Sequence, residues 1–381
     1  MDAPHIAPTH APAPRAAPEA LARTLPAQGE APARRWRPRR VLVTRAARGW
    51  PLAGRVCERA AALGAEIVEL PGDRLVGLGG GDARDSYRRA KSTLAVVVAS
   101  ESAMRPQPIP PSADWRFDLA TGCPAHCQYC YLAGSLKGPP VTRLFANLPE
   151  ILDRLPPLAG EGRVTSRMEA RRDEGTTFEA SCYTDPLAFE HLTGGLAECV
   201  EWFGGRPEMG LRFTTKFADT ESLEAAAHRG RTRARFSVNA DVVARRFEGG
   251  TAPLLQRLAA MGRLARAGYP VGLTVAPIMP LEGWREAYDA LFRDAAAALP
   301  PGADVTAELI THRFTPGSKE VLMGWYPATG LEMDESVRAV KRNKFGGRKY
   351  VYPKETMVEM RAALEASLAR HLLGARVLYW T

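Results

Sequence analysis

The chain has 381 residues, of which 45% are hydrophobic and 24% charged, as is typical of a folded globular protein. No apolar run reaches the ~20 residues that a transmembrane helix needs, and the N-terminus lacks the apolar core of a secretory signal. We therefore expect a cytoplasmic protein, whose six cysteines serve thiol, metal or catalytic chemistry rather than a disulfide framework. The net charge of +9 favours a nucleic-acid partner, although a solvated basic surface would give the same balance.

The first part of the chain is predicted to hold a tail and a small domain. Residues 1–39 are rich in Pro, Ala and Arg and cannot bury enough apolar surface to fold, so we expect a disordered tail. Its arginine run could touch DNA or simply solubilise the chain. Over residues 40–112, the runs VLVTRAA, EIVEL and STLAVVVAS predict three strands, and LAGRVCERAAALGA predicts a helix. These elements would form a small N-terminal α/β domain.

Beyond a proline-rich joint, strand-like and helix-like segments alternate. Predicted strands cover RFDLAT and residues 176–181, 211–217, 233–239, 271–277 and 305–311. Helical patterns lie near residues 145–155, 191–203, 221–229, 252–267 and 284–299. About six parallel strands with right-handed crossovers follow from this alternation. The fold class is therefore α/β, a partial (β/α)6 TIM-type barrel over residues 113–320, whose chemistry should lie at the carboxyl ends of its strands.

Two segments stand apart from this pattern. Residues 161–175 are highly charged and have no clear apolar face, so we expect a surface insertion between the first helix and the second strand of the barrel. Residues 321–381 form a C-terminal segment beyond the barrel.

The stretch TGCPAHCQYCYL contains three cysteines, Cys123, Cys127 and Cys130. A closed zinc site normally takes four ligands. The near candidate for a fourth, His126, is adjacent to Cys127, so the two side chains would struggle to converge on one ion. An iron–sulfur cluster with one iron not ligated by the protein is the stronger interpretation, because an open iron can bind a substrate or cosubstrate directly.

The C-x3-C-x2-C spacing, with Tyr129 before the third cysteine, resembles the hallmark of radical SAM enzymes. The wider sequence resembles the spore photoproduct lyase family, from about residue 40 to the end, with only the tail and the charged insertion outside the likeness. The motifs that carry it are AKSTLAVVV, ATGCPAHCQYCYL, FEASCYTD, FTTKF, RFSVN, VAPI, ITHRFTPGSK, GRKYVYPKE and VLYWT. The resemblance implies a [4Fe–4S] cluster and S-adenosyl-L-methionine (SAM) as cofactors on a radical SAM barrel.

The resemblance also implies a DNA repair lyase that reverses spore photoproduct, 5-thyminyl-5,6-dihydrothymine, to two thymines. One electron, from a carrier such as flavodoxin or ferredoxin, would release a 5′-deoxyadenosyl radical from SAM, and that radical would take a hydrogen atom from the lesion. Cys182, at the end of a predicted strand, matches the family's donor of the hydrogen atom that the thymine radical then needs. A lone cysteine is otherwise more often a small buried hydrophobe.

Further roles carry over by resemblance to residues around the cluster. Tyr129 and Tyr131 flank Cys130 and correspond to tyrosines that return the radical to SAM, although both rings could simply pack beside the cluster. The matched SAM contacts are Tyr129, near the adenine, and Thr184, Lys216, Ser237 and Ala276. Thr184 departs from the serine of the family pattern, which keeps the hydroxyl and leaves only its geometry open.

A β-hairpin over KRNKFGGRKYVY, residues 341–352, is expected by resemblance to approach DNA, with its two glycines at the turn. Its expected DNA-contacting residues are Lys341, Arg342, Lys344, Phe345, Arg348 and Lys349. The family commonly has Arg-Tyr where this chain has Lys-Phe, so a planar fork and a hydroxyl are lost while charge and ring remain. A solvated hairpin with no role in DNA binding is the alternative.

Two other functions fit parts of the sequence. The chain could be a related radical SAM enzyme that acts on another nucleic-acid or protein target. It could also be a non-enzymatic DNA-binding protein whose thiols hold a structural metal. We expect a monomer that does not associate with membranes.

Overall fold

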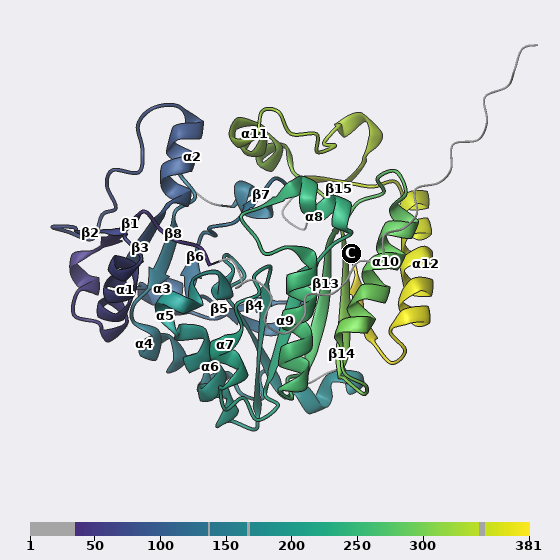
Figure 1. Cartoon of the computed structure of the whole chain (residues 1–381), viewed down its shortest axis with the longest axis horizontal. Coiled ribbons are helices and arrows are strands. Elements are labelled where there is room, and N and C mark those ends of the chain that lie inside the picture. Colours follow the sequence, from purple (N-terminus) through teal and green to yellow (C-terminus); the bar gives the residue numbers. More distant parts are fainter. Residues whose placement is uncertain (1–34, 136–137, 166–167, 343–346) are drawn as a thin grey trace, which may run out of the picture.

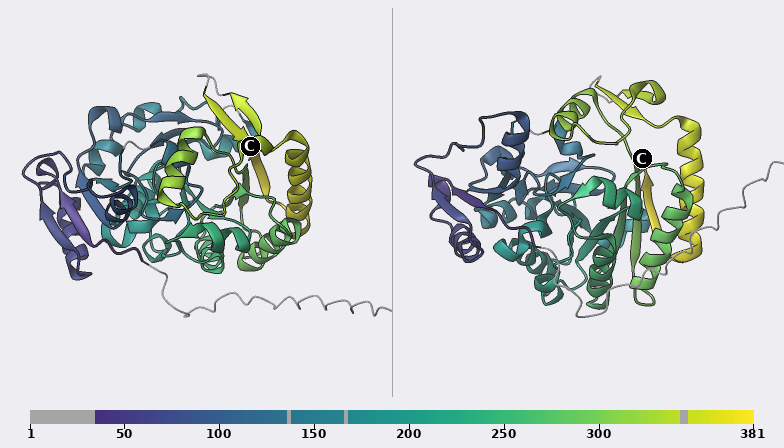
Figure 2. Two further views of the ribbon diagram at one scale, coloured as in Figure 1. Left: turned by 90° about the horizontal axis from the view of Figure 1, so that it is seen from above. Right: turned by 45° about the horizontal axis from the view of Figure 1, so that its top comes forward.

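The computed structural model describes residues 35–135, 138–165, 168–342 and 347–381. A five-stranded N-terminal sheet lies beside a curled eight-stranded sheet that forms the partial barrel (Figures 1 and 2), which confirms the predicted α/β class. Residues 1–34 of the expected tail, and Lys344 and Phe345 of the expected hairpin, lie outside the described residues. Within the described ranges no helix is long and apolar enough to cross a membrane.

The N-terminal sheet has the strand order β2-β1-β3-β8-β6. Its parallel strands β1 (Arg40–Val43), β2 (Glu66–Glu69) and β3 (Thr93–Val97) match the three predicted strands. Strand β8 (Thr142–Phe145) continues the sheet in parallel with β3, and β6 (Ala120–Thr121) pairs antiparallel with β8. Sheet pairing therefore crosses the boundary predicted between the N-terminal domain and the barrel. The three-cysteine segment begins at the edge of this sheet.

Two helices cover the N-terminal sheet. Helix α1 (Pro51–Ala62) is the predicted one and begins with proline, whose missing N–H costs nothing in the first turn. Helix α2 (Ala83–Lys91) begins after Asp82, whose carboxylate accepts a hydrogen bond from the Asp85 N–H at 2.8 Å. It buries Tyr87 and Lys91 on the face that looks toward the cysteine segment.

The barrel sheet has the order β17-β14-β13-β11-β10-β9-β5-β4. The strands are β4 (Gln107–Ile109), β5 (Ala113–Phe117), β9 (Thr176–Ala180), β10 (Met209–Thr215), β11 (Thr232–Val238), β13 (Val271–Ile278), β14 (Val305–Thr311) and β17 (Arg376–Trp380). The six strands from β5 to β14 are the predicted parallel strands. Two unpredicted strands extend the edges, β17 in parallel with β14 and β4 antiparallel to β5.

The remaining helices are α3 (Glu101–Met104), α4 (Leu148–Leu152), α5 (Glu190–Thr193), α6 (Gly195–Gly204), α7 (Glu221–Glu224), α8 (Asp241–Phe247), α9 (Leu254–Arg266), α10 (Trp284–Ala298), α11 (Pro316–Trp325) and α12 (Lys354–His371). The predicted pattern at 221–229 forms only the single turn α7, and the chain turns again at Arg229 and Gly230, which both have positive φ. Helix α12 was not predicted and covers the barrel beside α10.

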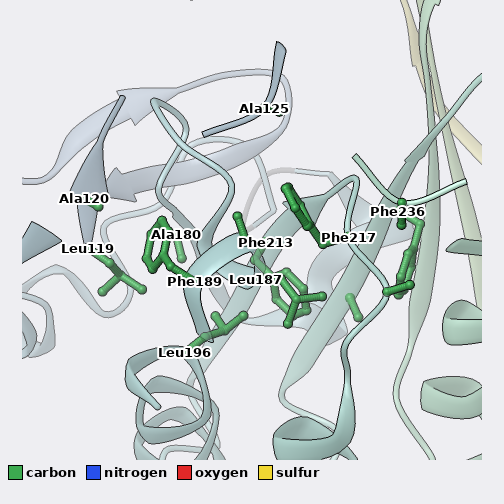
Figure 3. Packing of buried hydrophobic residues seen from close by; sticks show 14 of the residues in the cluster. Leu119, Ala120, Ala125, Ala180, Leu187, Phe189, Leu196, Phe213, Phe217 and Phe236 are labelled. Atoms are coloured by element: carbon green, nitrogen blue, oxygen red, sulfur yellow. The ribbon is translucent and has the colours of Figure 1, made fainter. Parts of the chain in front are cut away.

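Alternating side chains separate an apolar outer layer of the barrel from a charged interior. Phe213 and Phe236 pack among apolar side chains of the covering segments (Figure 3), while their neighbours Arg212 and Arg235 point to the other face. Arg212 and Arg235 both contact the carboxylate of Glu308, at 2.5 and 2.6 Å. These pairs join strands that are not neighbours in the sheet, so the side chains meet in its concave interior. Buried charges persist only when paired in this way.

The charged segment 161–175 is not the loose surface insertion that its composition predicts. Arg171 is 2% exposed and forms an ion pair with Glu174 at 2.9 Å. It also donates to backbone carbonyls next to β5, and Asp114 of β5 accepts hydrogen bonds from the N–H groups of Val164 and Thr165. The segment therefore packs beneath the barrel, because its charges find partners there that a sequence pattern does not show.

Candidate active site

The three cysteines lie on one loop between the two sheets. Gly122, just before Cys123, has φ +77°, and a Cβ there would lie 2.2 Å from a backbone oxygen, so only glycine fits. The loop then forms β7 (His126–Cys127), which pairs antiparallel with β12 (Glu248–Gly249). The N–H of Cys130 donates to the Cys127 carbonyl at 3.3 Å, which closes the turn. The loop is thus fixed at one end by the N-terminal sheet and in its middle by a barrel connection.

The thiols of Cys123, Cys127 and Cys130 form no disulfide bonds. Burial raises the pKa of Cys123 to about 12, and the charge of Lys91 opposes that rise. Burial also raises the pKa of Cys127, opposed by Lys216. In the described part of the chain, no group of three or more His, Cys, Asp or Glu side chains converges as ligands of one metal ion.

Lys216 brings three predicted site residues together at the carboxyl ends of the strands. It follows β10, and its ammonium donates to Ser237 Oγ of β11 at 2.8 Å and to the Tyr129 hydroxyl at 3.1 Å. Its third contact is Glu248, at 3.0 Å. The sequence predicted Lys216, Ser237 and Tyr129 as SAM contacts, and the structure places their polar atoms in one buried network.

Sequence reasoning missed Glu248, the acceptor at the centre of this network. Besides Lys216, it accepts a short hydrogen bond from the Tyr129 hydroxyl, and its second oxygen lies 2.5 Å from Arg257. Although burial opposes ionisation, Lys216 and Arg257 lower the pKa of Glu248 to about 2. Arg257 also donates to the backbone carbonyl of Ser237 at 3.0 Å. The local sequence signal is weak: an acidic residue between a phenylalanine and two glycines.

Cys182 lies just past the end of β9, as predicted. Ser181 before it has φ +60°, an uncommon conformation for a non-glycine residue that costs about 1–2 kcal/mol. Two hydrogen bonds hold it there, from the Ser181 N–H to the Phe117 carbonyl at 2.7 Å and from the Leu119 N–H to Ser181 Oγ at 2.9 Å. The Tyr131 hydroxyl donates to the Cys182 carbonyl. The structure therefore fixes Cys182 between the end of β5 and a loop tyrosine.

The surroundings of Cys182 favour a protonated thiol. Burial raises its pKa, and the negative charges of Glu179 and Asp118 raise it further. Asp118 itself lies in a buried position that raises its own pKa to about 6, against the opposing charge of Arg116. The S–H form is the one that can give up a hydrogen atom. Tyr131, in contrast, is 61% exposed, so its ring is accessible from the mouth of the barrel.

Two further predicted contacts have polar groups available to a ligand. The hydroxyl of Thr184 is buried and has no hydrogen-bond partner within the described residues. In β13 the register with β14 shifts between Val275 and Ile278, which leaves Ala276 without a register partner. A buried unsatisfied hydroxyl calls for a polar partner, so these residues fit a ligand as polar as SAM.

The predicted hairpin is present near the C-terminus. Its strands are β15 (Ala339–Arg342) and β16 (Arg348–Val351), which pair antiparallel. Their register places Lys341 opposite Lys349, and Arg342 opposite Arg348. Like charges directly opposite each other destabilise a hairpin, so this arrangement favours a polyanionic partner.

Comparison with known proteins settles the family of this site. A sequence model of the family described as spore photoproduct lyase matches residues 36–381. The chain belongs to the spore photoproduct lyase family. Spore photoproduct lyase of Bacillus subtilis (strain 168) is 39% identical over 347 residues, which cover 90% of this chain and 98% of the relative. That of Geobacillus sp. (strain Y412MC61) is 37% identical over 335 residues, 87% and 95% of the two chains.

Solved structures of spore photoproduct lyase share the fold. One that is complexed with dinucleoside spore photoproduct gives a TM-score of 0.83 at 36% identity and covers 91% of this chain and 100% of its own. A variant with bound AdoMet and dinucleoside spore photoproduct gives 0.82 at 36% identity, with coverage of 90% and 99%. The protein is therefore a radical SAM lyase that repairs spore photoproduct with a [4Fe–4S] cluster and SAM, as its motifs implied.

Proposed function

We propose that this lyase restores two thymines in DNA by hydrogen-atom transfer from Cys182. When bound, the cluster on Cys123, Cys127 and Cys130, together with SAM, supplies a 5′-deoxyadenosyl radical that removes a hydrogen atom from the lesion. Cys182 gives the hydrogen atom of its S–H bond to the thymine radical that remains once the bridging carbon–carbon bond has broken. The observation that carries this role is a thiol held protonated at a strand end, with Tyr131 bonded to its carbonyl.

Two tyrosines connect the donor with the SAM side of the site. Tyr131 contacts Cys182, and Tyr129 belongs to the network of Lys216 and Glu248. After donation the Cys182 sulfur lacks one hydrogen atom. Tyr131 would restore the S–H bond by giving its O–H hydrogen atom, and Tyr129 would give its own O–H hydrogen atom to Tyr131. The balance would close when 5′-deoxyadenosine returns to Tyr129 the hydrogen atom that was taken from the lesion.

Polar residues at the strand ends hold SAM. Lys216 pairs with the SAM carboxylate, exchanging one of its two hydroxyl partners for the stronger charged one. Ser237 and Thr184 offer hydroxyl groups, and Ala276 offers backbone groups outside the regular ladder. Glu248 keeps the Lys216 ammonium at the strand end, so its role is to position the group that binds SAM.

The C-terminal hairpin binds the DNA backbone around the lesion. Lys341, Arg342 and Arg348 are exposed, and Lys349 is half-buried with a pKa lowered by burial and by its basic neighbours. Phosphates would offset the repulsion between these opposed cations and release counterions. Lys344 and Phe345 of the turn complete the proposed contact from outside the described residues, with Phe345 as a wedge beside the extruded dinucleotide.

The reaction also needs a partner that delivers one electron. We propose a small carrier such as flavodoxin or ferredoxin, because these proteins supply single electrons to iron–sulfur centres. Because the substrate is chromosomal DNA, we propose that the enzyme works in the cytoplasm, and that it acts as a monomer.

The test is a repair assay with the anaerobically reconstituted enzyme, dithionite, SAM and a spore photoproduct dinucleotide. The wild type should release both thymines, measured by chromatography, while Cys182→Ala should cleave SAM at the normal rate and divert the thymine radical to side products. Cys57→Ala is the matched control. Cys57 is a partly buried thiol on α1, a helix that precedes all of the proposed site residues in the sequence. Clean repair by Cys182→Ala would refute the donor role.

A further inference from the structure

A buried lysine of the N-terminal domain contacts the cysteine loop. Lys91, the last residue of α2, is 7% exposed, and its ammonium donates to the carbonyls of Cys123 at 2.6 Å and Ala125 at 2.5 Å. Taking an ammonium out of water costs several kcal/mol, so buried lysines normally pair with a carboxylate. Within the described chain Lys91 has no such partner. Its other neighbour is the ring of Tyr87, whose centroid lies 5.5 Å from the nitrogen.

Tyr87 lies one turn earlier on the same buried face of α2. Its hydroxyl forms a hydrogen bond with Nδ1 of His126 at 2.8 Å and a second, short one with the hydroxyl of Tyr326. Its ring centroid lies 4.9 Å from that of Trp325, at the end of α11. Helix α2 therefore contacts the cysteine loop through two side chains, Lys91 and Tyr87, and α11 packs against the second of them.

No carboxylate of the described chain offsets the charge of Lys91, whose hydrogen-bond partners are the carbonyls of Cys123 and Ala125. On the barrel side of the loop, Glu248 lies between two cations, 3.0 Å from Lys216 and 2.5 Å from Arg257. A cluster that accepts an electron gains negative charge, so a nearby cation without a counter-charge stabilises the reduced form. Net charge and hydrogen bonding around iron–sulfur clusters are the levers that set their reduction potentials.

We propose that Lys91 raises the reduction potential of the cluster held by Cys123, Cys127 and Cys130, and that with Tyr87 it makes the N-terminal domain part of the electron-accepting centre. Lys91 is thus a positioning residue, which acts on the reaction through the cluster and touches neither SAM nor DNA. The inference rests on the cofactor set and on the cluster ligands of the proposed function. It needs no particular lesion, so its test omits DNA altogether.

The test is a redox titration of the reconstituted protein without SAM or DNA, followed by electron paramagnetic resonance of the reduced cluster. Lys91→Gln removes the charge and keeps a donor. We expect its ratio of reduced to oxidised cluster at a fixed potential to fall about tenfold, which is ~59 mV for a one-electron couple. Lys91→Arg, which keeps the charge, should stay within about threefold of the wild type by the same conversion. The matched control is Arg88→Gln, an exposed cation on the same helix whose charge is screened by water.

Three outcomes would overturn the proposal: an unchanged titration for Lys91→Gln, an equal shift for Arg88→Gln, or a shift in Lys91→Arg as large as that in Lys91→Gln. Iron and sulfide analysis shows whether Lys91→Gln binds a cluster at all. If it binds none, cluster uptake by Lys91→Arg becomes the deciding measurement. Cluster uptake by the arginine variant supports a role of charge, and failure of both variants refutes it. Tyr87→Phe adds a second readout, because it should leave the potential unchanged while the cluster is lost faster to a chelator. A shifted titration together with failed repair would leave the inference standing and count against the proposed function alone.

Discussion

Two lysines contact the cysteine loop from opposite sides, and their surroundings differ. On the barrel side, the Lys216 ammonium has three acceptors, one of them the carboxylate of Glu248. On the side of the N-terminal domain, Lys91 has two backbone carbonyls and no carboxylate. Both are largely buried, and each opposes the rise in the pKa of one cluster thiol.

The difference gives the two lysines different roles, one in orienting a ligand and the other in acting through its charge. The ammonium of Lys216 is held in a fixed direction by its three acceptors, so it is suited to orient a ligand at short range. An unpaired cation keeps its charge, and in surroundings of low dielectric that charge acts over several ångströms. The same residue type can therefore bind SAM on one side of the loop and tune electron uptake on the other.

The strongest test of this contrast is the SAM affinity of Lys216→Met. Loss of a charge-assisted hydrogen bond of about 1.5–3 kcal/mol should weaken SAM binding by about tenfold to 100-fold. Calorimetric titration of the reconstituted protein measures it. Lys91→Gln is the control, and its SAM affinity should change less than about threefold, because Lys91 acts through charge at longer range. Equal losses of SAM affinity in the two variants would show that the two lysines do not have different roles.

Glu248→Gln tests whether pairing is what fixes Lys216. The variant keeps the shape of the side chain but leaves Lys216 and Arg257 without their common counter-charge. The free energy of unfolding should fall by about 3 kcal/mol, as for other broken buried ion pairs, and SAM binding should weaken with it. Urea denaturation gives the first quantity and calorimetry the second.

The control for that variant is Glu224→Gln. Glu224 pairs with Arg263 at 2.8 Å, but both side chains are 34% exposed. Surface pairs of this kind contribute at most about 1 kcal/mol, so the control should lose little. If the two variants lost the same stability, Glu248 would have no special part in the network.

The hairpin extends the comparison to cations that face water. Changing Lys341 and Arg342 together to serine should lower the slope of log affinity against log salt by about 2 for duplex DNA, because each phosphate contact contributes ~0.9. Repair of the isolated dinucleotide should not change, since exposed charges are screened and do not act on the cluster. Binding at several salt concentrations tests the first expectation. An unchanged slope would indicate that the hairpin is solvated and has no role in DNA binding.

The smallest expected effect is that of pH on hydrogen donation. Because the pKa of Cys182 is raised, its thiol stays protonated above pH ~8.5, where an ordinary cysteine is half ionised. The ratio of restored thymine to side products should therefore stay constant up to about pH 9, as measured by chromatography at several pH values. Asp118→Asn removes one of the charges that raise this pKa, so a decline in its ratio should begin at lower pH. A decline centred near pH 8.5 in the wild type would contradict a protected thiol.

Much of the fold followed from local patterns. The strands from β9 to β14 are runs of β-branched and aromatic residues, and their alternation with helices required a parallel sheet. The edge strand β17 was not predicted, because VLYWT gains its strand partner only when the C-terminus returns to β14. Helix α12 was missed as well. The packing of the charged segment 161–175 was not predicted, because its hydrogen-bond partners at Pro111 and Asp114 lie elsewhere in the chain.

The sequence by itself determined the chemistry of this protein, because the spacing of Cys123, Cys127 and Cys130 and the position of Cys182 at a strand end are local properties. Only the tertiary structure decided how that chemistry is supported. Glu248 and Arg257, both from the connection between β11 and β13, meet Lys216 of the preceding connection, and Lys91 reaches the cysteine loop from a separate sheet. Such contacts depend on which elements pack together. Packing sets the neighbours of a charged side chain, and these neighbours decide how its charge acts on the site.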